Sequence, residues 1–217
     1  GAGGGSDFIS RQIAQGISGA LGQPVIVDNR NAAVATEVVS KAAPDGYTLL
    51  VNGGSLWITP LLRNAPYDAL RDFSPISLLV REVNVVVVHP SVPARTVKEL
   101  IALAKAKPGQ LNYSSTGVGS PVHLRAELFN SMAGVKIINV PYKSSVPALT
   151  ALISGEVQVA IFDSGLVGPH VKLGKLRALA VTSGEPSALA PGLPTVAATG
   201  LPGYESVSMT GIWAPGE

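Results

Sequence analysis

The regular alternation of strand-sized apolar runs with helical patterns constrains the fold of this chain more than any other feature of its sequence. Runs such as "VQVAIFD" and "LRALAVTS" have the length and composition of strands, and "ISLLV" and "NVVVVHP" are apolar throughout. Unbroken apolar runs are typical of strands that are covered on both faces. Strands and helices that alternate in this way predict an α/β fold of right-handed βαβ units with mostly parallel sheets.

Capping residues and glycines mark the expected helix ends. Apolar residues recur at helical spacing between Ser6, the expected N-cap, and Gly22, where that helix should stop. The following "PVIVDN" is predicted to be a strand. Thr96 and Glu99 stand at capping-box spacing before a second helix. A further helix is predicted over residues 121–133, and its apolar side is expected to carry Leu124, Leu128 and Met132.

The strands fall into two groups, one before Val88 and one after Leu111, and a last strand-like stretch follows the second group. This order is typical of two α/β lobes that are joined by extended segments and hold a ligand cleft between them. We expect a first lobe over residues 1–87, completed by a returning segment over 207–217, and a second lobe over 88–206. Because the helices that would complete the first lobe are absent, the sequence is expected to be truncated at both ends.

The composition excludes several classes of function. Only 14% of the residues are charged and the net charge is +2, so no basic face for nucleic acid is expected. The chain has no cysteine, and its three histidines show no metal-binding spacing, so a metal site is not expected. No apolar run reaches the length that spans a membrane. The sequence indicates no cofactor.

Three glycine loops indicate where a ligand would bind. "SSTGVGSPVH" follows a predicted strand and opens a helix, and its Gly117 and Gly119 let the backbone approach a ligand closely. "GAGGGSD" and "NGGSLW" repeat this arrangement. An anion cradle and an ordinary tight turn fit the composition of such loops equally well. Nucleotide binding is disfavoured, because neither a GxGxxG fingerprint nor a Gly-Lys-Ser/Thr run is present.

A covalent catalytic site is disfavoured. Ser120 lacks the GxSxG surroundings of a hydrolase nucleophile, and His123 follows it within the same first helical turn. Asp163 ends the strand "VQVAIFD", where a helix N-cap and a ligand contact are equally plausible roles. Tyr142 and Lys143 end the neighbouring strand and offer a phenol and an ammonium to a carboxylate, although Lys143 fits a surface position equally well.

The whole chain resembles a known family. "LGQPVIVDNR", "AAPDGYTLL", "PYDALRDFSPISLL", "LNYSSTGVGSPVHLRAELF", "NVPYK" and "LPTVAATGLPGYE" occur in the order typical of the Bug family, the extracytoplasmic solute receptors of tripartite tricarboxylate transporters. The resemblance implies a two-lobed Venus-flytrap fold of the periplasmic-binding-protein type II class. It also implies a periplasmic location after removal of a signal peptide, a monomeric state, delivery of the ligand to membrane permease subunits, and no enzymatic activity.

Members of this family hold small carboxylates mainly through main-chain N–H groups, which implies a ligand site in the glycine loops of this chain. On the family pattern one wall comes from the first lobe and the other from the second. The implied ligand-binding residues are Gly3, Gly4, Gly5, Ser6, Asp7, Gly53, Gly54, Ser55, Ser115, Thr116, Gly117, Gly119, Ser120, His123, Tyr142, Lys143 and Asp163.

Two departures from the family pattern and two alternative functions stay open. Asn31–Glu37 lacks the glycines that the family usually carries there, so the role of that loop is not predicted, and Ser144 and Ser145 stand where glycines are common. An isomerase or hydrolase that acts on a small carboxylate is the alternative on the same scaffold. A receptor that feeds a two-component sensor instead of a transporter is the other alternative.

Overall fold

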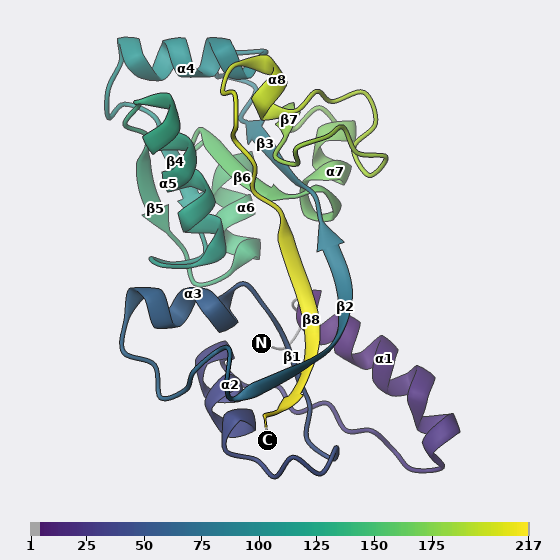
Figure 1. Ribbon diagram of the computed structural model, residues 1–217. Coiled ribbons are helices and arrows are strands. Elements are labelled where there is room, and N and C mark those ends of the chain that lie inside the picture. Colours follow the sequence, from purple (N-terminus) through teal and green to yellow (C-terminus); the bar gives the residue numbers. More distant parts are fainter. Residues whose placement is uncertain (1–4, 217) are drawn as a thin grey trace. The chain divides into compact units, whose positions relative to one another are not determined.

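The computed structural model describes residues 5–216, which divide into two compact units (Figure 1). Unit 1 contains the described residues up to Arg81 and those from Met209 onward, and unit 2 spans Glu82–Ser208. The chain therefore crosses between the units twice, after Arg81 and after Ser208.

Unit 2 is built on a five-stranded sheet in the order β5-β4-β6-β3-β7. Strands β5 and β6 both pair in parallel with β4, whereas β3 pairs antiparallel with β6 and with β7. All strands except β3 therefore run in one direction, but two of the four pairings are antiparallel, so the sheet is mixed. The bounds are β3 (Asn84–Val88), β4 (Asn112–Ser115), β5 (Ile138–Pro141), β6 (Val159–Asp163) and β7 (Arg177–Val181).

Helices cover both faces of this sheet, as Figure 1 shows for unit 2. In β3, Val86 and Val88 belong to one core cluster with residues of α4 and α5, while Val85 and Val87 belong to a second cluster with residues of α6 and α7. Successive side chains of a strand point to opposite faces, so one apolar run serves both cores. The helices are α4 (Val97–Ala106), α5 (Pro121–Ala133), α6 (Ser145–Ile153), α7 (Ser164–Lys172) and α8 (Val196–Thr199).

Unit 1 contains a three-stranded sheet in the order β1-β8-β2, in which β1 and β8 pair antiparallel. Its own core cluster is small and includes Leu50, Leu56 and Phe73. No helix among the described residues combines the length and apolar character needed to cross a membrane. The elements are α1 (Gly5–Leu21), α2 (Ala32–Ser40), β1 (Leu50–Gly53), α3 (Ser55–Leu62), β2 (Phe73–Glu82) and β8 (Ser208–Pro215).

Most of the expected elements form, but several local predictions are wrong. The segment "PVIVDN" is not a strand, and its Ile26 is 85% exposed. The run "ISLLV" lies in β2, yet Ile76 and Leu78 are exposed instead of covered on both faces. Helix α1 begins at Gly5, so Ser6 lies inside it and is not its N-cap. The Asn31–Glu37 segment forms the cap and first turns of α2, with the Asn31 side chain accepting a hydrogen bond from the Ala33 N–H.

Helix α5 also buries a different face from the predicted one. Leu128 and Met132 are about two-fifths exposed, at 40% and 39%. The buried positions are Ala126, Phe129 and Ala133, together with the polar residues Arg125 and Asn130. Gly134 ends the helix in the left-handed region, at φ 61°.

Gly53 is required by packing inside unit 1. It pairs with Thr210 of β8, and a Cβ atom at Gly53 would lie 2.7 Å from the carbonyl oxygen of Met209. A main-chain oxygen cannot move aside as the end of a flexible side chain does. The absence of a side chain at Gly53 therefore permits β1 and β8 to approach each other.

This close approach predicts that Gly53→Ala lowers the free energy of unfolding by about 1–3 kcal/mol, the usual cost of overpacking. Gly19→Ala is the matched control, because a Cβ at Gly19 of α1 meets nothing within 4 Å. That substitution should raise the free energy of unfolding by about 0.5–1 kcal/mol by restricting the unfolded chain. Urea unfolding of both variants measures the difference, and equal effects would contradict the packing argument.

Candidate ligand-binding site

The carboxyl ends of three neighbouring parallel strands bring predicted site residues of unit 2 to one edge of the sheet. Ser115 ends β4, Asp163 ends β6, and Tyr142 directly follows β5. The main-chain N–H of Tyr142 donates to the carbonyl oxygen of Ser115 at 2.9 Å. This edge is where α/β sheets commonly bind ligands, because the following helices begin there.

The loop after β4 presents main-chain N–H groups. Gly117 and Gly119 have backbone φ values of 114° and 78°, a region that residues other than glycine rarely adopt. In the described part of the chain, the N–H groups of Gly117, Val118 and Val122 donate to no protein acceptor. They lie beside the amino-terminal end of α5, where the helix dipole is positive.

Two buried hydroxyls lie at the end of β4. Ser114 and Ser115 are fully buried, and neither Oγ atom has a hydrogen-bond partner within the described chain. An unpartnered buried hydroxyl costs about 1–3 kcal/mol, so two in succession are unusual outside a functional site. Because alternate residues of a strand point to opposite faces, these two hydroxyls serve different sides of β4.

Ser120 and Asp163 are helix N-caps, and His123 supports the glycine loop. Ser120 Oγ accepts a hydrogen bond from the His123 N–H at 3.2 Å, and His123 Nδ1 accepts one from the Gly119 N–H at 3.2 Å. Asp163 is the N-cap of α7, and its Oδ1 accepts from the Leu166 N–H at 2.8 Å. The ring of His123 therefore orders the glycine loop and is not hydrogen-bonded to the Ser120 hydroxyl.

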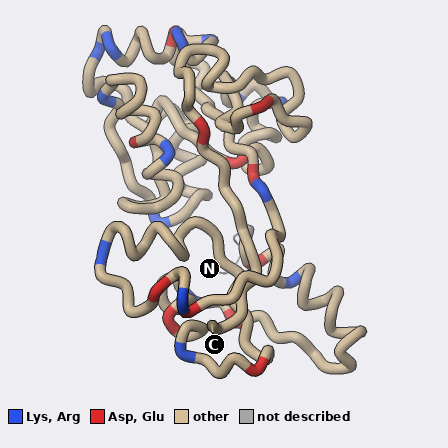
Figure 2. Tube along the Cα trace, in the orientation of Figure 1, with Lys and Arg blue, Asp and Glu red and all other residues tan. Residues whose placement is uncertain are grey.

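Tyr142 and Lys143 behave differently from each other. The Tyr142 hydroxyl donates to Glu156 at 2.7 Å, and burial together with this bond raises the pKa of the phenol to about 12. The hydroxyl proton of Tyr142 is therefore engaged in the hydrogen bond to Glu156. Lys143 is exposed just beyond it. The positions of Lys and Arg and those of Asp and Glu are scattered along the trace of each unit (Figure 2).

The predicted residues of unit 1 also have partners inside their own unit. Gly3 and Gly4 lie outside the described residues, and Gly5, Ser6 and Asp7 form the start of α1. Asp7 accepts from Asn29 at 2.7 Å and pairs with Arg11 at 2.9 Å. The Ser55 hydroxyl donates to Asn52 Oδ1 at 2.7 Å, beside Gly53 and Gly54. That these loops share one ligand with the loops of unit 2 stays a prediction.

Arg125, whose guanidinium is buried in unit 2, was not predicted from the sequence as a functional residue. It donates to Asn84 Oδ1, to the Ile161 carbonyl at 3.2 Å and to Ser208 Oγ at 2.6 Å. The ion pairs found among the described residues all lie in unit 1, so Arg125 is held by neutral acceptors. Burial lowers the pKa of its guanidinium, while the nearby Glu82 and Asp163 act to raise it.

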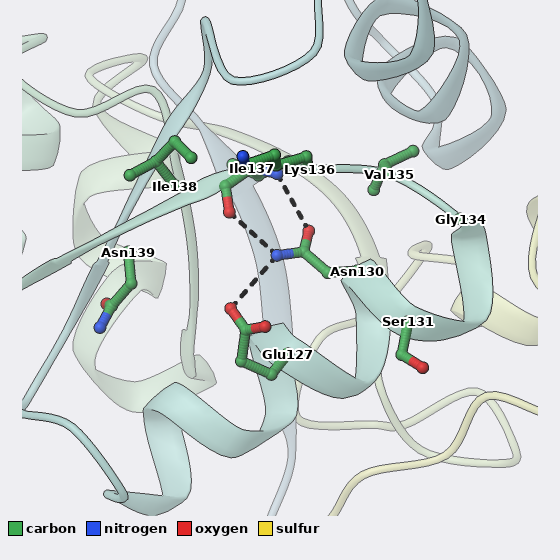
Figure 3. Close-up of a pocket in the computed structure, with 9 residues that line it drawn as sticks. All are labelled: Glu127, Asn130, Ser131, Gly134, Val135, Lys136, Ile137, Ile138 and Asn139. Atoms are coloured by element: carbon green, nitrogen blue, oxygen red, sulfur yellow. Dashed lines mark hydrogen bonds between the residues drawn. The ribbon is translucent and has the colours of Figure 1, made fainter.

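Two hollows on the surface have no predicted site residue among those that line them. One, with a volume of about 490 Å³, is bounded by the end of α5 and the start of β5 (Figure 3). There Asn130 donates to Glu127 and to the Ile137 carbonyl, so these polar groups fasten α5 to the adjoining strand. The other, of about 340 Å³, lies in unit 1 between Trp57, Trp213 and the apolar side chains of β2. It offers few donors to a carboxylate.

A family model described as "Tripartite tricarboxylate transporter family receptor" matches residues 9–217. This match covers nearly the whole chain and both units. The chain belongs to this receptor family.

Solved structures of related receptors agree with the assignment. R. palustris Rpa4515 with adipate is 36% identical, with a TM-score of 0.88 over 99% of this chain and 74% of that one. MatC from Rhodopseudomonas palustris with bound malate is 29% identical, with a TM-score of 0.86 over 99% of this chain and 75% of that one. The periplasmic binding protein BugD is 29% identical, with a TM-score of 0.85 over 100% of this chain and 74% of that one. The predicted α/β binding-protein fold is therefore confirmed.

The chain is shorter than its relatives. Six curated bacterial relatives match it at 33% to 37% identity over at least 89% of its length, and the chain spans 61% to 66% of theirs. The receptor described here thus corresponds to about two thirds of such a protein.

Glu82 is expected to make the stability of the folded protein depend on pH. Burial raises the pKa of its carboxyl, Asp163 raises it further, and Arg125 opposes them. Between the unfolded and the folded pKa the folded state binds more protons, so stability falls as pH rises through this window. Glu82→Gln should therefore stabilise the protein at pH 7, with the gain in stability disappearing below about pH 4.

Glu185→Gln, at an exposed glutamate of unit 2, is the control. Thermal unfolding from pH 3 to pH 8 measures both, and parallel curves for wild type and Glu82→Gln would contradict this account.

Proposed function

We propose that this receptor binds a small organic carboxylate at the carboxyl edge of the unit 2 sheet. The observation that carries the proposal is the set of unpartnered N–H groups at Gly117, Val118 and Val122, in the loop and helix start that follow the buried Ser115. N–H donors, a hydroxyl and a helix N-terminus together suit the oxygens of an anion. Two related receptors of known structure carry the dicarboxylates adipate and malate, which supports the same class of ligand here.

Neutral donors favour holding the anion over transforming it. Each hydrogen bond from a neutral donor to a charged oxygen contributes about 1.5–3 kcal/mol, so a few of them account for tight binding. Ser120, His123 and Asp163 are engaged as caps and loop supports, which supports a receptor that releases its ligand unchanged. NMR of ligand incubated with the protein tests this directly, since any conversion to product would favour the enzymatic alternative.

The location and the partner follow from the same proposal. Family membership and the likeness to periplasmic BugD support a periplasmic receptor that presents its ligand to the permease subunits of a tripartite transporter. Loops of unit 1, at Gly3–Asp7 and Gly53–Ser55, are proposed to add further donors to the ligand, as the family pattern implies. Monomeric behaviour in gel filtration is expected.

Ligand class is tested by thermal shift with mono- and dicarboxylates of four to nine carbons, including adipate and malate. At least one is expected to raise the midpoint of unfolding, because a ligand that binds only the native state stabilises it. Adipamide is the matched neutral control for adipate and should have no effect, since it lacks the charged oxygens. A panel without any stabilising carboxylate would reject the proposal.

Ser115 and Ser114 offer a matched pair of variants. Ser115→Ala should weaken binding of the stabilising carboxylate about 10- to 150-fold, the loss expected for one hydrogen bond to a charged group. Ser114→Ala removes an equally buried hydroxyl from the other side of β4 and should leave the affinity within about twofold. Isothermal titration of both variants measures the difference. Equal affinities would exclude Ser115 from the site.

A further inference from the structure

The two places where the chain crosses between the units are fastened to each other inside unit 2. Asn84 lies just after the first crossing and Ser208 just before the second. The Asn84 amide donates to Ser208 Oγ and to the Ser206 carbonyl, each at 3.4 Å. Residues 124 positions apart in sequence are thereby joined side chain to side chain.

Thr182 of unit 2 completes this set of bonds. Its N–H donates to the Asn84 carbonyl at 2.9 Å, and its hydroxyl donates to the Ser206 carbonyl at 2.5 Å. The Ser206 N–H donates back to the Thr182 carbonyl at 2.8 Å. Thr182 and Asn84 are 0% exposed, so water does not compete for these groups. We call Asn84, Arg125, Thr182, Ser206 and Ser208 the crossing cluster.

Arg125 is the one cation of the crossing cluster and its central donor. One terminal nitrogen of its guanidinium bonds to Asn84 Oδ1 and the other to Ser208 Oγ, so a single planar group spans both crossings. Its contact with the Ile161 carbonyl ties the same group to β6 in the middle of the sheet. A rigid fork of this kind fixes direction as well as distance, which a lysine ammonium on a flexible stem does not.

We propose that Arg125 is a positioning residue that clamps both crossings to unit 2, so that the units move relative to each other by bending at Arg81–Glu82 and Ser208–Met209. Buried hydrogen bonds hold the chain on the unit 2 side of these points, which coincide with the last residues of β2 and the first residues of β8. A binding protein of this kind gains affinity when its binding-competent arrangement is limited to few conformations. The link to ligand affinity rests on the proposed function, but the clamp itself does not.

Amide hydrogen exchange measures directly whether Arg125 stabilises the crossing cluster. In Arg125→Met the amide hydrogens of Thr182 and Ser206, which donate within the crossing cluster, should exchange about tenfold faster or more, because Asn84 Oδ1 and Ser208 Oγ lose their donor. Arg177→Met is the matched control. The Arg177 guanidinium also bonds to neutral acceptors, the carbonyls of Pro90, Val92 and Ala94, but touches neither crossing. It should leave the exchange of Thr182 and Ser206 unchanged.

Spin-label distances measure what the clamp does to the motion. The chain has no cysteine, so Leu70→Cys in unit 1 and Leu173→Cys in unit 2, at 92% and 70% exposure, give one label each. Without ligand, Arg125→Met should broaden the distance distribution relative to the labelled wild type, Arg125→Lys should restore it only in part, and Arg177→Met should not alter it. Ser208→Ala removes the two bonds that Ser208 Oγ accepts, from Asn84 and from Arg125, with little risk to folding, and should broaden the distribution slightly.

The outcomes separate this proposal from the proposed function. Equal widths for wild type, Arg125→Met and Ser208→Ala would overturn the clamp whether or not any carboxylate binds. If Arg125→Met does not fold, Ser208→Ala alone decides, by its width and by the exchange of Ser206. A wild type whose distances do not respond to adipate, malate or the other carboxylates tested would count against the proposed function alone, because the widths without ligand still report on Arg125.

Discussion

Unit 2 depends on the burial of β3 on both faces. Val85–Val88 are at most 2% exposed, and full burial of a side chain of this size contributes about 1.5–3 kcal/mol. The strand hydrogen-bonds to β6 on one side and β7 on the other, so its backbone polar groups are satisfied without water. Its direction, antiparallel to its neighbours, places its first residue, Asn84, opposite Asp163 at the carboxyl edge of β6. The chain thus enters unit 2 at the same edge that carries the glycine loop.

Signals that act within a few residues made much of this fold predictable. The N-cap at Thr96 acts on the helix that begins there, and the sequence predicts it correctly. Apolar runs predicted β3 and β6 for the same reason. The strand prediction for "PVIVDN" was wrong because an apolar run shows only that burial is possible. The neighbours that would cover Ile26 must come from elsewhere in the chain.

In the candidate site, too, features that depend on nearby residues could be predicted, and those that depend on distant residues could not. The glycine loop with Gly117, Gly119 and Ser120 could be predicted because turn and capping preferences are local, whereas its role in ligand binding stays a prediction. Arg125 could not, since nothing around it in the sequence distinguishes a buried arginine from an exposed one. Its partners Asn84 and Ser208 are 41 and 83 residues away and become neighbours only when the sheet forms. The same reason explains the wrong face of α5, where specific hydrogen bonds bury Arg125 and Asn130 while Leu128 stays partly exposed.

A buried cation at this edge resolves an electrostatic difficulty of the proposed anion site. Glu82 and Asp163 both lie close to Arg125, and two carboxylates near a bound carboxylate would repel it. At the proposed site Arg125 would offset part of that repulsion, because its hydrogen bonds go to neutral acceptors and none of the ion pairs among the described residues includes it. A cation that touched the ligand would bind it more tightly but would release it more slowly. Neutral donors at the contact and a cation behind them therefore suit a receptor that must both capture its ligand and give it up.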